Sequence, residues 1–163
     1  MNSSVSISLA KVGEAPLVAR LLQLCLHDLS AWHPRPIRPD GSFAYPWFAL
    51  YWESPRRYPY LLRSAGGIAG FALVRAKEDD ETADWDFALA EFFVLPKERR
   101  HGVGLAAAGQ VLNQHRGLFE ISYDRRNLAA KRFWPRVSSL YGTPGPMPVG
   151  EHGERYLLHV GPR

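Results

Sequence analysis

The sequence contains a single cysteine, Cys25, so no internal disulfide can form. Such sparse cysteine is typical of proteins in a reducing compartment, and we expect a cytoplasmic protein. Cys25 lies within a helical stripe of apolar residues, which favours a buried, inert thiol over a nucleophile. His27 and Asp28 follow closely, but no helix geometry brings Cys25, His27 and Asp28 together as a catalytic group.

Long apolar runs and an excess of one charge are missing as well. No 18 consecutive apolar residues occur, and the N-terminus lacks the basic start and apolar core of a secretory signal, so we expect no membrane partner. The net charge is only +4, from 20 Lys and Arg against 16 Asp and Glu. The arginines are scattered rather than gathered on one stripe, which argues against a nucleic-acid partner.

What is present is the composition of a globular domain of ordinary size. The 163 residues are 46% hydrophobic and 22% charged, which suffices for a sizeable core. Neither an internal repeat nor a linker-like segment interrupts the chain. We therefore expect residues 1–163 to form one domain.

Periodicity and turn residues predict a mixture of strands and helices. The acidic run Lys77–Asp84 is expected to be a solvated loop, and the Pro/Gly-rich stretch Gly142–Gly150 an irregular one. The other expected elements are a strand at Val5–Lys11, a helix from Pro16 to Leu29, a short helix opening at Pro46, a hairpin of Tyr58–Arg63 and Ile68–Arg75, a central strand at 85–96, a helix at Val103–Arg116 capped by Gly117, a strand at Leu118–Tyr123, a helix at Leu128–Val137 and a strand at 155–160.

A basic loop runs into two glycines in the middle of the chain. After the central strand come Lys97, Arg99, Arg100 and His101, and then Gly102 and Gly104 at the start of a helix. A helix N-terminus offers unpaired N–H groups and a positive dipole end, and glycine lets an anion approach the backbone. The pattern indicates a pyrophosphate site, although an ordinary surface turn has the same composition.

Two other phosphate-binding patterns fit less well. A Walker A loop requires Lys-Ser or Lys-Thr after its last glycine, and Leu105-Ala106 stands there instead. A dinucleotide-binding fold is the stronger alternative, because Gly102–Ala107 satisfies a relaxed G-x-G-x-x-A and Asp124 ends the next strand about 20 residues on. In that fold, however, the strand runs directly into the first glycine, whereas a proline and a basic loop intervene here.

The same stretch resembles motif A of the GNAT superfamily of N-acetyltransferases, a strand and Val-x-Pro followed by Arg/Gln-x-x-Gly-x-Gly/Ala and a helix. The matching residues are Val94-Leu95-Pro96 and Arg99-Arg100-His101-Gly102-Val103-Gly104. A second signature, Asn-x-x-Ala-x-x-Phe-Tyr, is matched by Asn127, Ala130 and Phe133, with Trp134 in the tyrosine position. The order of the expected elements agrees too, so the resemblance covers nearly the whole chain.

The resemblance implies an α/β fold in a single acetyltransferase-like domain. Its central sheet would be mixed and mostly antiparallel, with one splayed parallel strand pair, and helices would flank it. Acetyl-CoA would be the donor, lying between the strands that end at Val94 and Tyr123, and no metal is implied. The residues implied in coenzyme binding are Phe92, Phe93, Val94, Arg99, Arg100, His101, Gly102, Val103, Gly104, Leu105, Asn127 and Phe133.

The implied reaction is direct attack of a primary amine of a small molecule or peptide on the thioester, with a base removing the amine proton. Glu91 is the candidate base because burial in an apolar strand raises a carboxyl pKa; a structural acid paired with an arginine is equally consistent. Trp134 stands where the family often has an acidic tyrosine, and an indole cannot supply a proton. Tyr123 or Tyr141 would replace it, or the thiolate would leave unaided.

The resemblance implies that the aromatic segment Trp32–Trp52 builds the acceptor pocket, and its rings can stack on an aromatic or cationic group or simply pack on the sheet. Trp134 also leaves open a non-catalytic acyl-CoA-binding module, and a homodimer stays open as an assembly. The residues expected to contact the acceptor are Asp28, Tyr45, Trp47, Tyr51 and Trp52.

Overall fold

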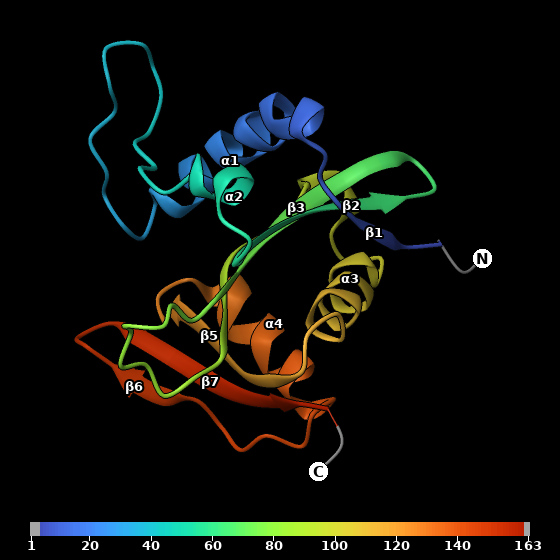
Figure 1. Ribbon diagram of the computed structural model, residues 1–163, viewed down its shortest axis with the longest axis vertical. Coiled ribbons are helices and arrows are strands. Elements are labelled where there is room, and N and C mark those ends of the chain that lie inside the picture. Colours follow the sequence, from blue (N-terminus) through green and yellow to red (C-terminus); the bar gives the residue numbers. More distant parts are fainter. Residues whose placement is uncertain (1–3, 162–163) are drawn as a thin grey trace.

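The computed structural model describes residues 4–161, and these residues build a seven-stranded sheet in the order β1-β2-β3-β4-β5-β7-β6 (Figure 1). Every neighbouring pair is antiparallel except β4 and β5, which are parallel. The strands are β1 (Ser6–Leu9), β2 (Arg57–Ser64), β3 (Gly67–Ala76), β4 (Phe87–Val94), β5 (Gly117–Asp124), β6 (Met147–Val149) and β7 (Gly153–Val160). The helices are α1 (Ala15–Leu29), α2 (Leu50–Glu53), α3 (Val103–Leu112) and α4 (Leu128–Ser139), with single 3-10 turns at Val12–Glu14 and Pro96–Glu98. The expected mixed, mostly antiparallel sheet with flanking helices is confirmed.

Helices pack on both faces of the sheet, and alternation along the strands decides which side chains meet them. One apolar cluster joins α1 and α2 to Leu61, Phe71 and Phe93; we call this face the α1 face. The other cluster joins α3 and α4 to strand residues that include Phe119 and Ile121. In the part of the chain that the structure describes, no helix combines the length and the apolar character that a membrane span needs.

The parallel strands β4 and β5 are paired only at their N-terminal ends. Phe87 pairs with Phe119 and Ala88 with Glu120, and no further pair follows. The other edge of β5 pairs with β7 along its whole length. The two strands therefore diverge towards Val94 and Asp124, and this wedge is the splayed pair that the resemblance implied.

A β-bulge in β4 decides where its side chains point. Leu73 pairs with Glu91 and Val74 with Leu89, so Ala90 is an extra residue with no opposite partner on β3. An extra residue shifts all later side chains to the other face. Leu89 accordingly packs towards α3 and α4, whereas Glu91 and Phe93 lie on the α1 face.

Two helices, α3 and α2, have different bounds from those that the sequence pattern predicted. α3 ends at Leu112 rather than Arg116, because the chain turns and buries His115, whose Nε2 lies at hydrogen-bond distance, 2.9 Å, from the Tyr60 hydroxyl oxygen. Gly117 is thus no helix cap; it opens β5, where a Cβ would lie 2.6 Å from the Asp86 carboxylate. Only α2, from Leu50, is helical in the segment expected to be a helix from Pro46.

Two segments expected to be irregular are more ordered. Residues 147–149 form β6, which pairs with β7 despite the surrounding prolines and glycines. The acidic run 77–84 is not simply solvated, since its carboxylates form ion pairs with arginines of β2, β3 and β7 and with Arg56, which precedes β2. These pairs are Glu78 with Arg56 and Arg57, Asp79 with Arg56, Glu81 with Arg75, and Asp84 with Arg155.

Candidate active site

The loop in front of α3 presents a row of free backbone donors at the open end of the wedge. Within residues 4–161, the N–H groups of residues 100–105 donate no hydrogen bond. Arg100 and Gly102 both adopt positive φ, at 65° and 79°, which turns the chain sharply before the helix. Successive N–H groups at a turn and a helix N-terminus form an anion-binding concavity. The loop predicted to bind a pyrophosphate thus has free backbone donors and the backbone turn typical of an anion-binding site.

The two glycines of this loop have different roles. A side chain at Gly102 would meet nothing within 4 Å, so glycine is needed there for the backbone conformation. A Cβ at Gly104 would lie 3.2 Å from the Phe133 ring and 3.6 Å from a Val94 methyl. Gly104 therefore lets α4 and β4 close tightly against the start of α3.

Aromatic rings form a wall between β4 and α4. Phe92 stacks on Phe133 with centroids 5.8 Å apart, and Trp134 meets both rings edge-on at 5.6 and 4.8 Å. Trp134 is buried and belongs to the apolar core. The residue that replaces the family tyrosine is thus part of the packing of this wall.

The residues predicted to bind the coenzyme lie together along the wedge, but the side chain of Arg99 already binds other groups of the protein. Arg99 reaches back across the loop: its Nε donates to the Val94 carbonyl oxygen at 2.7 Å, and its Nη2 lies 2.9 Å from the Asp28 carboxylate. A predicted coenzyme residue is therefore paired with a predicted acceptor residue. Asn127 caps α4, with its side-chain oxygen accepting from the Ala130 N–H at 3.1 Å, and its amide nitrogen is left to donate.

Glu91 lies on the α1 face, beneath the segment that connects α1 to α2. The Cys25 thiol approaches its carboxylate at 3.9 Å, and Tyr45 contributes its hydroxyl. Burial raises the pKa of Glu91 to about 7, against the charge of Arg35 and the hydrogen bonds of Tyr45 and Cys25. Burial and the neighbouring Glu91 also raise the pKa of the Cys25 thiol, which keeps it protonated and agrees with an inert thiol.

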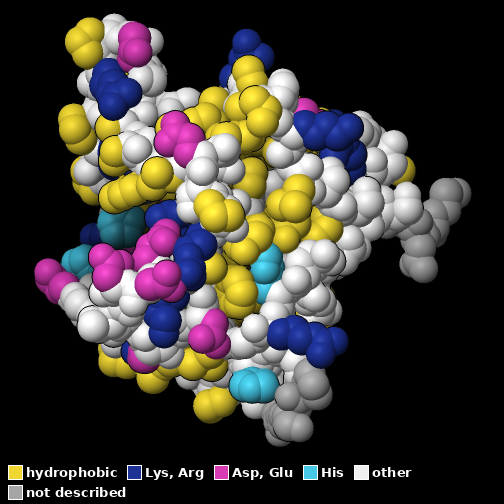
Figure 2. Space-filling view, viewed as in Figure 1, with side chains coloured by type: hydrophobic (Ala, Val, Ile, Leu, Met, Phe, Trp, Pro, Cys, Tyr) yellow, Lys and Arg dark blue, Asp and Glu magenta, His cyan; other side chains and the backbone are white. Residues whose placement is uncertain are grey.

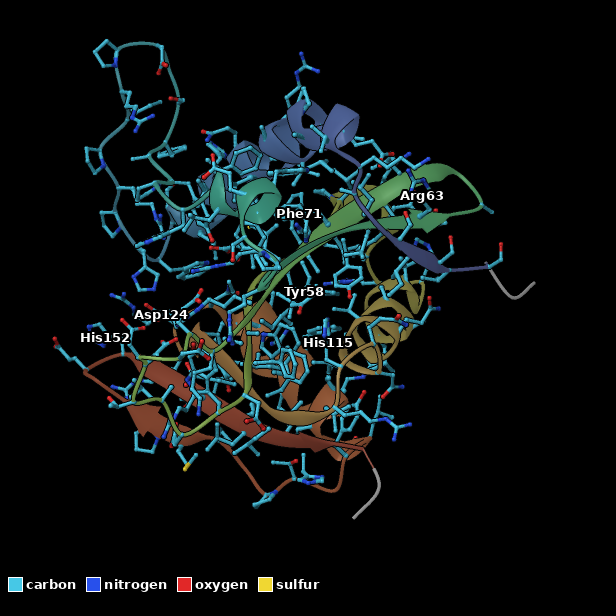
Figure 3. All side chains as sticks on the ribbon, viewed as in Figure 1. Tyr58, Arg63, Phe71, His115, Asp124 and His152 are labelled. Atoms are coloured by element: carbon cyan, nitrogen blue, oxygen red, sulfur yellow. The ribbon has the colours of Figure 1, made fainter. Side chains whose placement is uncertain are left out.

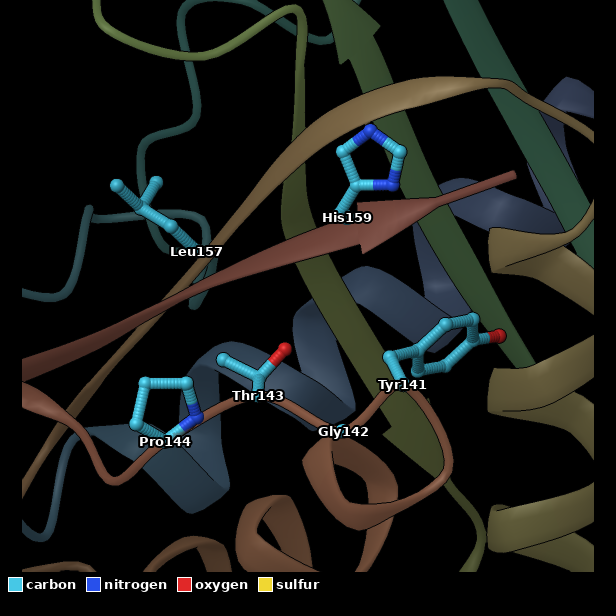
Figure 4. Close-up of a pocket in the computed structure, with 6 residues that line it drawn as sticks. All are labelled: Tyr141, Gly142, Thr143, Pro144, Leu157 and His159. Carbon is cyan, nitrogen blue, oxygen red and sulfur yellow. The ribbon is translucent and has the colours of Figure 1, made fainter. Parts of the chain in front are cut away.

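The two tyrosines predicted as acids lie in different surroundings. The Tyr123 hydroxyl donates to Glu154 at 2.6 Å, and burial together with this carboxylate raises the pKa of Tyr123. Tyr141 donates to the Asn113 side chain at 3.1 Å, at the end of α3 opposite the phosphate loop. Tyr141 also borders a groove of about 380 Å³ that runs along β7 between Pro144 and His159 (Figure 4).

The four aromatic residues expected at the acceptor side differ in exposure. Trp47 is the open one, 55% exposed, with Tyr45 against it edge-to-face at 5.6 Å. Trp52 packs on Phe48 at 4.7 Å, and Tyr51 is buried against the sheet. The surroundings of Tyr51 and Trp52 agree with the second alternative given above, in which these rings pack on the sheet.

The segment 30–49 projects from the body of the molecule (Figure 1), and its base is tied to the end of β5. Arg126 donates to the Trp32 carbonyl at 2.7 Å, and His33 lies 3.2 Å from Asp124. Asp124 is buried and receives two-pronged hydrogen bonds from Arg126, which hold the pKa of Asp124 well below its usual range (Figure 3). A cavity of about 240 Å³ adjoins it, lined by His33, Ser122, Tyr123, Asp124, Val149 and Gly153.

Two features of the site were not predicted. The bulge at Ala90 leaves only a weak trace in the sequence, a change in the parity of the apolar positions between Leu89 and Phe92. The Asp124–Arg126 pair joins residues two apart, but its contact with Trp32 and His33 depends on the tertiary structure. Since Asp124 is already engaged and the sheet has one parallel pair within residues 4–161, a dinucleotide-binding fold does not fit.

Comparisons with known proteins agree with this geometry. The acetyltransferase (GNAT) family profile matches residues 21–138. No curated protein matches the chain. Solved structures with a similar fold include an acetyltransferase from Thermus thermophilus, with a TM-score of 0.70, 15% identity and 96% and 97% of the two chains covered.

Two further similar structures contain coenzyme A. The aminoglycoside acetyltransferase AAC(6')-Ib, in complex with coenzyme A and kanamycin, has a TM-score of 0.64 at 13% identity, covering 96% of this chain and 95% of that one. Spermidine N-acetyltransferase from Vibrio cholerae, in complex with coenzyme A and spermine, has a TM-score of 0.61 at 10% identity, covering 96% and 94%. At these identities the likeness concerns the fold, and the family match extends over most of the chain: the protein belongs to the GNAT family of acetyltransferases.

Proposed function

We propose that the protein transfers an acetyl group from acetyl-CoA to a primary amine of a small molecule or peptide. The observation that carries this proposal is the row of free N–H groups at residues 100–105, at the mouth of the β4–β5 wedge. The pyrophosphate would lie on these donors, helped by the exposed Arg100 and His101. The pantetheine arm would follow β4 from Val94 towards the bulge, with the Asn127 amide donating to it.

The chemistry is a direct acyl transfer. The amine nitrogen forms a bond to the thioester carbon, the carbon–sulfur bond breaks, and the amine proton is lost. Backbone N–H groups of β4 that face the wedge, beyond its two pairs with β5, are the donors we propose for the developing oxyanion. Glu91 takes the proton, because a carboxyl with a pKa near 7 is an effective base at neutral pH.

The proton donor to the leaving sulfur is not Trp134, because an indole cannot act as an acid. Tyr123 and Tyr141 are the candidates, and each hydroxyl already donates to another residue. Replacing each by phenylalanine decides between them: a loss of tenfold or more in kcat assigns the acid. Unchanged rates in both variants mean that the thiolate leaves unaided, as alkyl thiols ionise only about 1.5 pH units above neutrality.

The amines named for the two coenzyme A complexes, an aminoglycoside and a polyamine, support a primary amine as acceptor. The experiment that tests the proposal is a calorimetric titration with acetyl-CoA and, in parallel, with NADH. Micromolar binding of acetyl-CoA alone is expected. Binding of NADH alone would overturn the proposal, and an amine screen with detection of released thiol would follow the expected result.

A second candidate function, an acyl-CoA-binding module without catalysis, rests on the buried Trp134. Trp134→Tyr distinguishes the two functions. Turnover that appears only in the variant, or exceeds that of the unchanged protein, favours the binding module. Full turnover in the unchanged protein counts against it.

A further inference from the structure

The junction of α2 and β2 buries three polar atoms that have no hydrogen-bond partner within residues 4–161. They are the Tyr51 hydroxyl, the Trp52 indole nitrogen and the Arg57 Nε. Tyr51 is only 3% exposed, and the Arg57 side chain only 10%. Leaving a buried donor unpaired costs about 1–3 kcal/mol, and more when the group is charged. Two of these atoms belong to neighbouring side chains, Tyr51 and Arg57, and a polar ligand would complete both.

Arg57 differs in this respect from the arginines around it. Arg56 donates to Asp79 at 2.6 Å, and Arg75 holds both oxygens of Glu81 at 2.9 Å. The ion pair of Arg57 with Glu78 is longer, at 3.8 Å, which is beyond hydrogen-bond distance. The acidic run 77–84 therefore hydrogen-bonds to Arg56 and Arg75, whereas Arg57 has no hydrogen bond to a carboxylate within residues 4–161. Figure 2 shows acidic and basic side chains intermixed on this side of the molecule.

Arg57 lies on the same face of the sheet as Glu91. It is opposite Arg75 on β3, and Glu91 is opposite Leu73 on the same strand. Arg57 and Glu91 are therefore separated by two strand spacings across the sheet and two residues along it. This puts their Cα atoms about 12 Å apart, and the long arginine side chain covers much of this distance. Tyr51 lies between them: its ring centroid is 5.6 Å from the Arg57 Cζ.

The electrostatics of Tyr51 agree with this placement. Burial raises the pKa of Tyr51, the Arg57 guanidinium opposes the rise, and the charge of Glu91 adds to it. The hydroxyl is thus within electrostatic reach of both groups. Arg57 supplies a cation, Tyr51 a neighbouring hydroxyl and Glu91 a base, all on one face of the sheet. A ligand that has both an anionic group and an amine matches this arrangement.

We propose that Arg57 and the Tyr51 hydroxyl bind a carboxylate of the acceptor while its amine lies at Glu91. The acceptor is then an amino-acid-like molecule, a primary amine with a carboxylate a few bonds away. This inference rests on the proposed acetyl transfer to an amine. A planar guanidinium pairs well with a carboxylate.

The test compares matched pairs of amines, each amino acid against the amine that lacks its carboxylate, such as L-phenylalanine with 2-phenylethylamine and L-lysine with cadaverine. With acetyl-CoA as donor, we expect kcat/KM to be at least tenfold higher for the carboxylate-bearing member of one or more pairs. Arg57→Gln should abolish this preference mainly through KM. Arg56→Gln, one residue earlier and bonded to Asp79, is the control and should retain it.

Three results would overturn the inference: equal rates within every pair, no acetylation of any carboxylate-bearing amine, or equal behaviour of Arg57→Gln and Arg56→Gln. If Arg57→Gln does not fold, Arg57→Lys keeps the charge but loses the planar pairing, and the preference should fall without disappearing.

A binding measurement separates this inference from the proposed function. The amino acids of the panel, added without donor, should raise the melting temperature of the unchanged protein and of Arg56→Gln but not of Arg57→Gln. If acetyl-CoA does not bind, the proposed function fails, and this shift still reports on the carboxylate site. If acetyl-CoA binds and the plain amines are preferred, only the carboxylate site is wrong.

Discussion

The Arg99 guanidinium lies 2.9 Å from the Asp28 carboxylate and joins the last turn of α1 to the loop in front of α3. The same side chain holds the Val94 carbonyl at the end of β4 and lies 5.4 Å from the Phe93 ring. The sequence placed Arg99 with the coenzyme and Asp28 with the acceptor. Their pairing links the two sides of the site through one side chain.

This ion pair should contribute little to stability. Its partners are 44% and 45% exposed, and exposed pairs are worth at most about 1 kcal/mol. A double-mutant cycle with Asp28→Asn and Arg99→Gln, measured by urea unfolding, should give a coupling free energy in that range that decreases as salt is added. A coupling above about 2 kcal/mol would show that the pair is more than a surface contact.

Gly104→Ala should weaken acetyl-CoA binding by about tenfold or more, since even a 1 Å displacement in a positioned site is costly. The added methyl would press on Phe133 at 3.2 Å and disturb the start of α3, where the pyrophosphate is proposed to bind. Gly109→Ala is the matched control, because a methyl there meets nothing within 4 Å. The control should keep full affinity in a calorimetric titration. Equal affinities in the two variants would remove Gly104 from the coenzyme site.

The rate should depend on Glu91 through its ionisation. Because a base acts when deprotonated, kcat/KM should rise with pH through about 7, the raised pKa of Glu91. Glu91→Gln should lower the rate most at neutral pH and less at high pH, where the amine loses its proton to solvent. A pH–rate profile checks this, and the same profile in Glu91→Gln and the unchanged protein would exclude Glu91 as the base.

Ionisation of the Glu91 carboxyl, which should raise the rate as pH rises, should lower the stability of the folded protein. A folded-state pKa raised above the unfolded value of 4.5 stabilises the protein fully below pH 4.5, and this stability is lost as pH rises to about 7. Glu91→Gln should therefore gain stability relative to the unchanged protein between pH 5 and pH 8, by up to about 3 kcal/mol. Urea unfolding at the two pH values measures the change, and a constant difference between the proteins would contradict the raised pKa.

His115 should make the fold sensitive to acid. It points inward beside Tyr58 (Figure 3), and burial lowers its pKa. The unfolded chain takes up a proton below about pH 6.5 that the native state resists, so stability is lost as pH falls. His115→Phe should reduce this loss of stability between about pH 7.5 and 5.5, which urea unfolding at the two pH values measures. Identical pH dependence of stability in the variant and the unchanged protein would refute this assignment.

The bounds of the elements around the proposed coenzyme site could be predicted from the sequence because they depend on local signals. Val94 ends β4, Val103 opens α3 and Asn127 caps α4, where the motifs placed them. Each of these boundaries depends on residues within one turn of the chain, namely a proline, a left-handed glycine or a capping side chain.

Predictions failed where distant residues decide the local structure. Gly117 looked like a helix cap, but the burial of His115 against Tyr60 ends α3 earlier. The acidic run looked solvated because the arginines that bind it lie on strands far along the chain, Arg155 among them. Sequence spacing contains no information about such pairs.

By itself the sequence determined the mixed fold, the glycine loop before α3 and the family, since these follow from periodicity and contiguous motifs. Only the tertiary structure decided that β4 and β5 separate after two residue pairs, that a bulge at Ala90 turns Glu91 to the α1 face, and that the Arg57 Nε is buried without a hydrogen-bond partner within residues 4–161. These three features depend on strand register and on contacts between distant segments. Free energies of packing and desolvation over the whole sheet set them, and no short stretch of residues can.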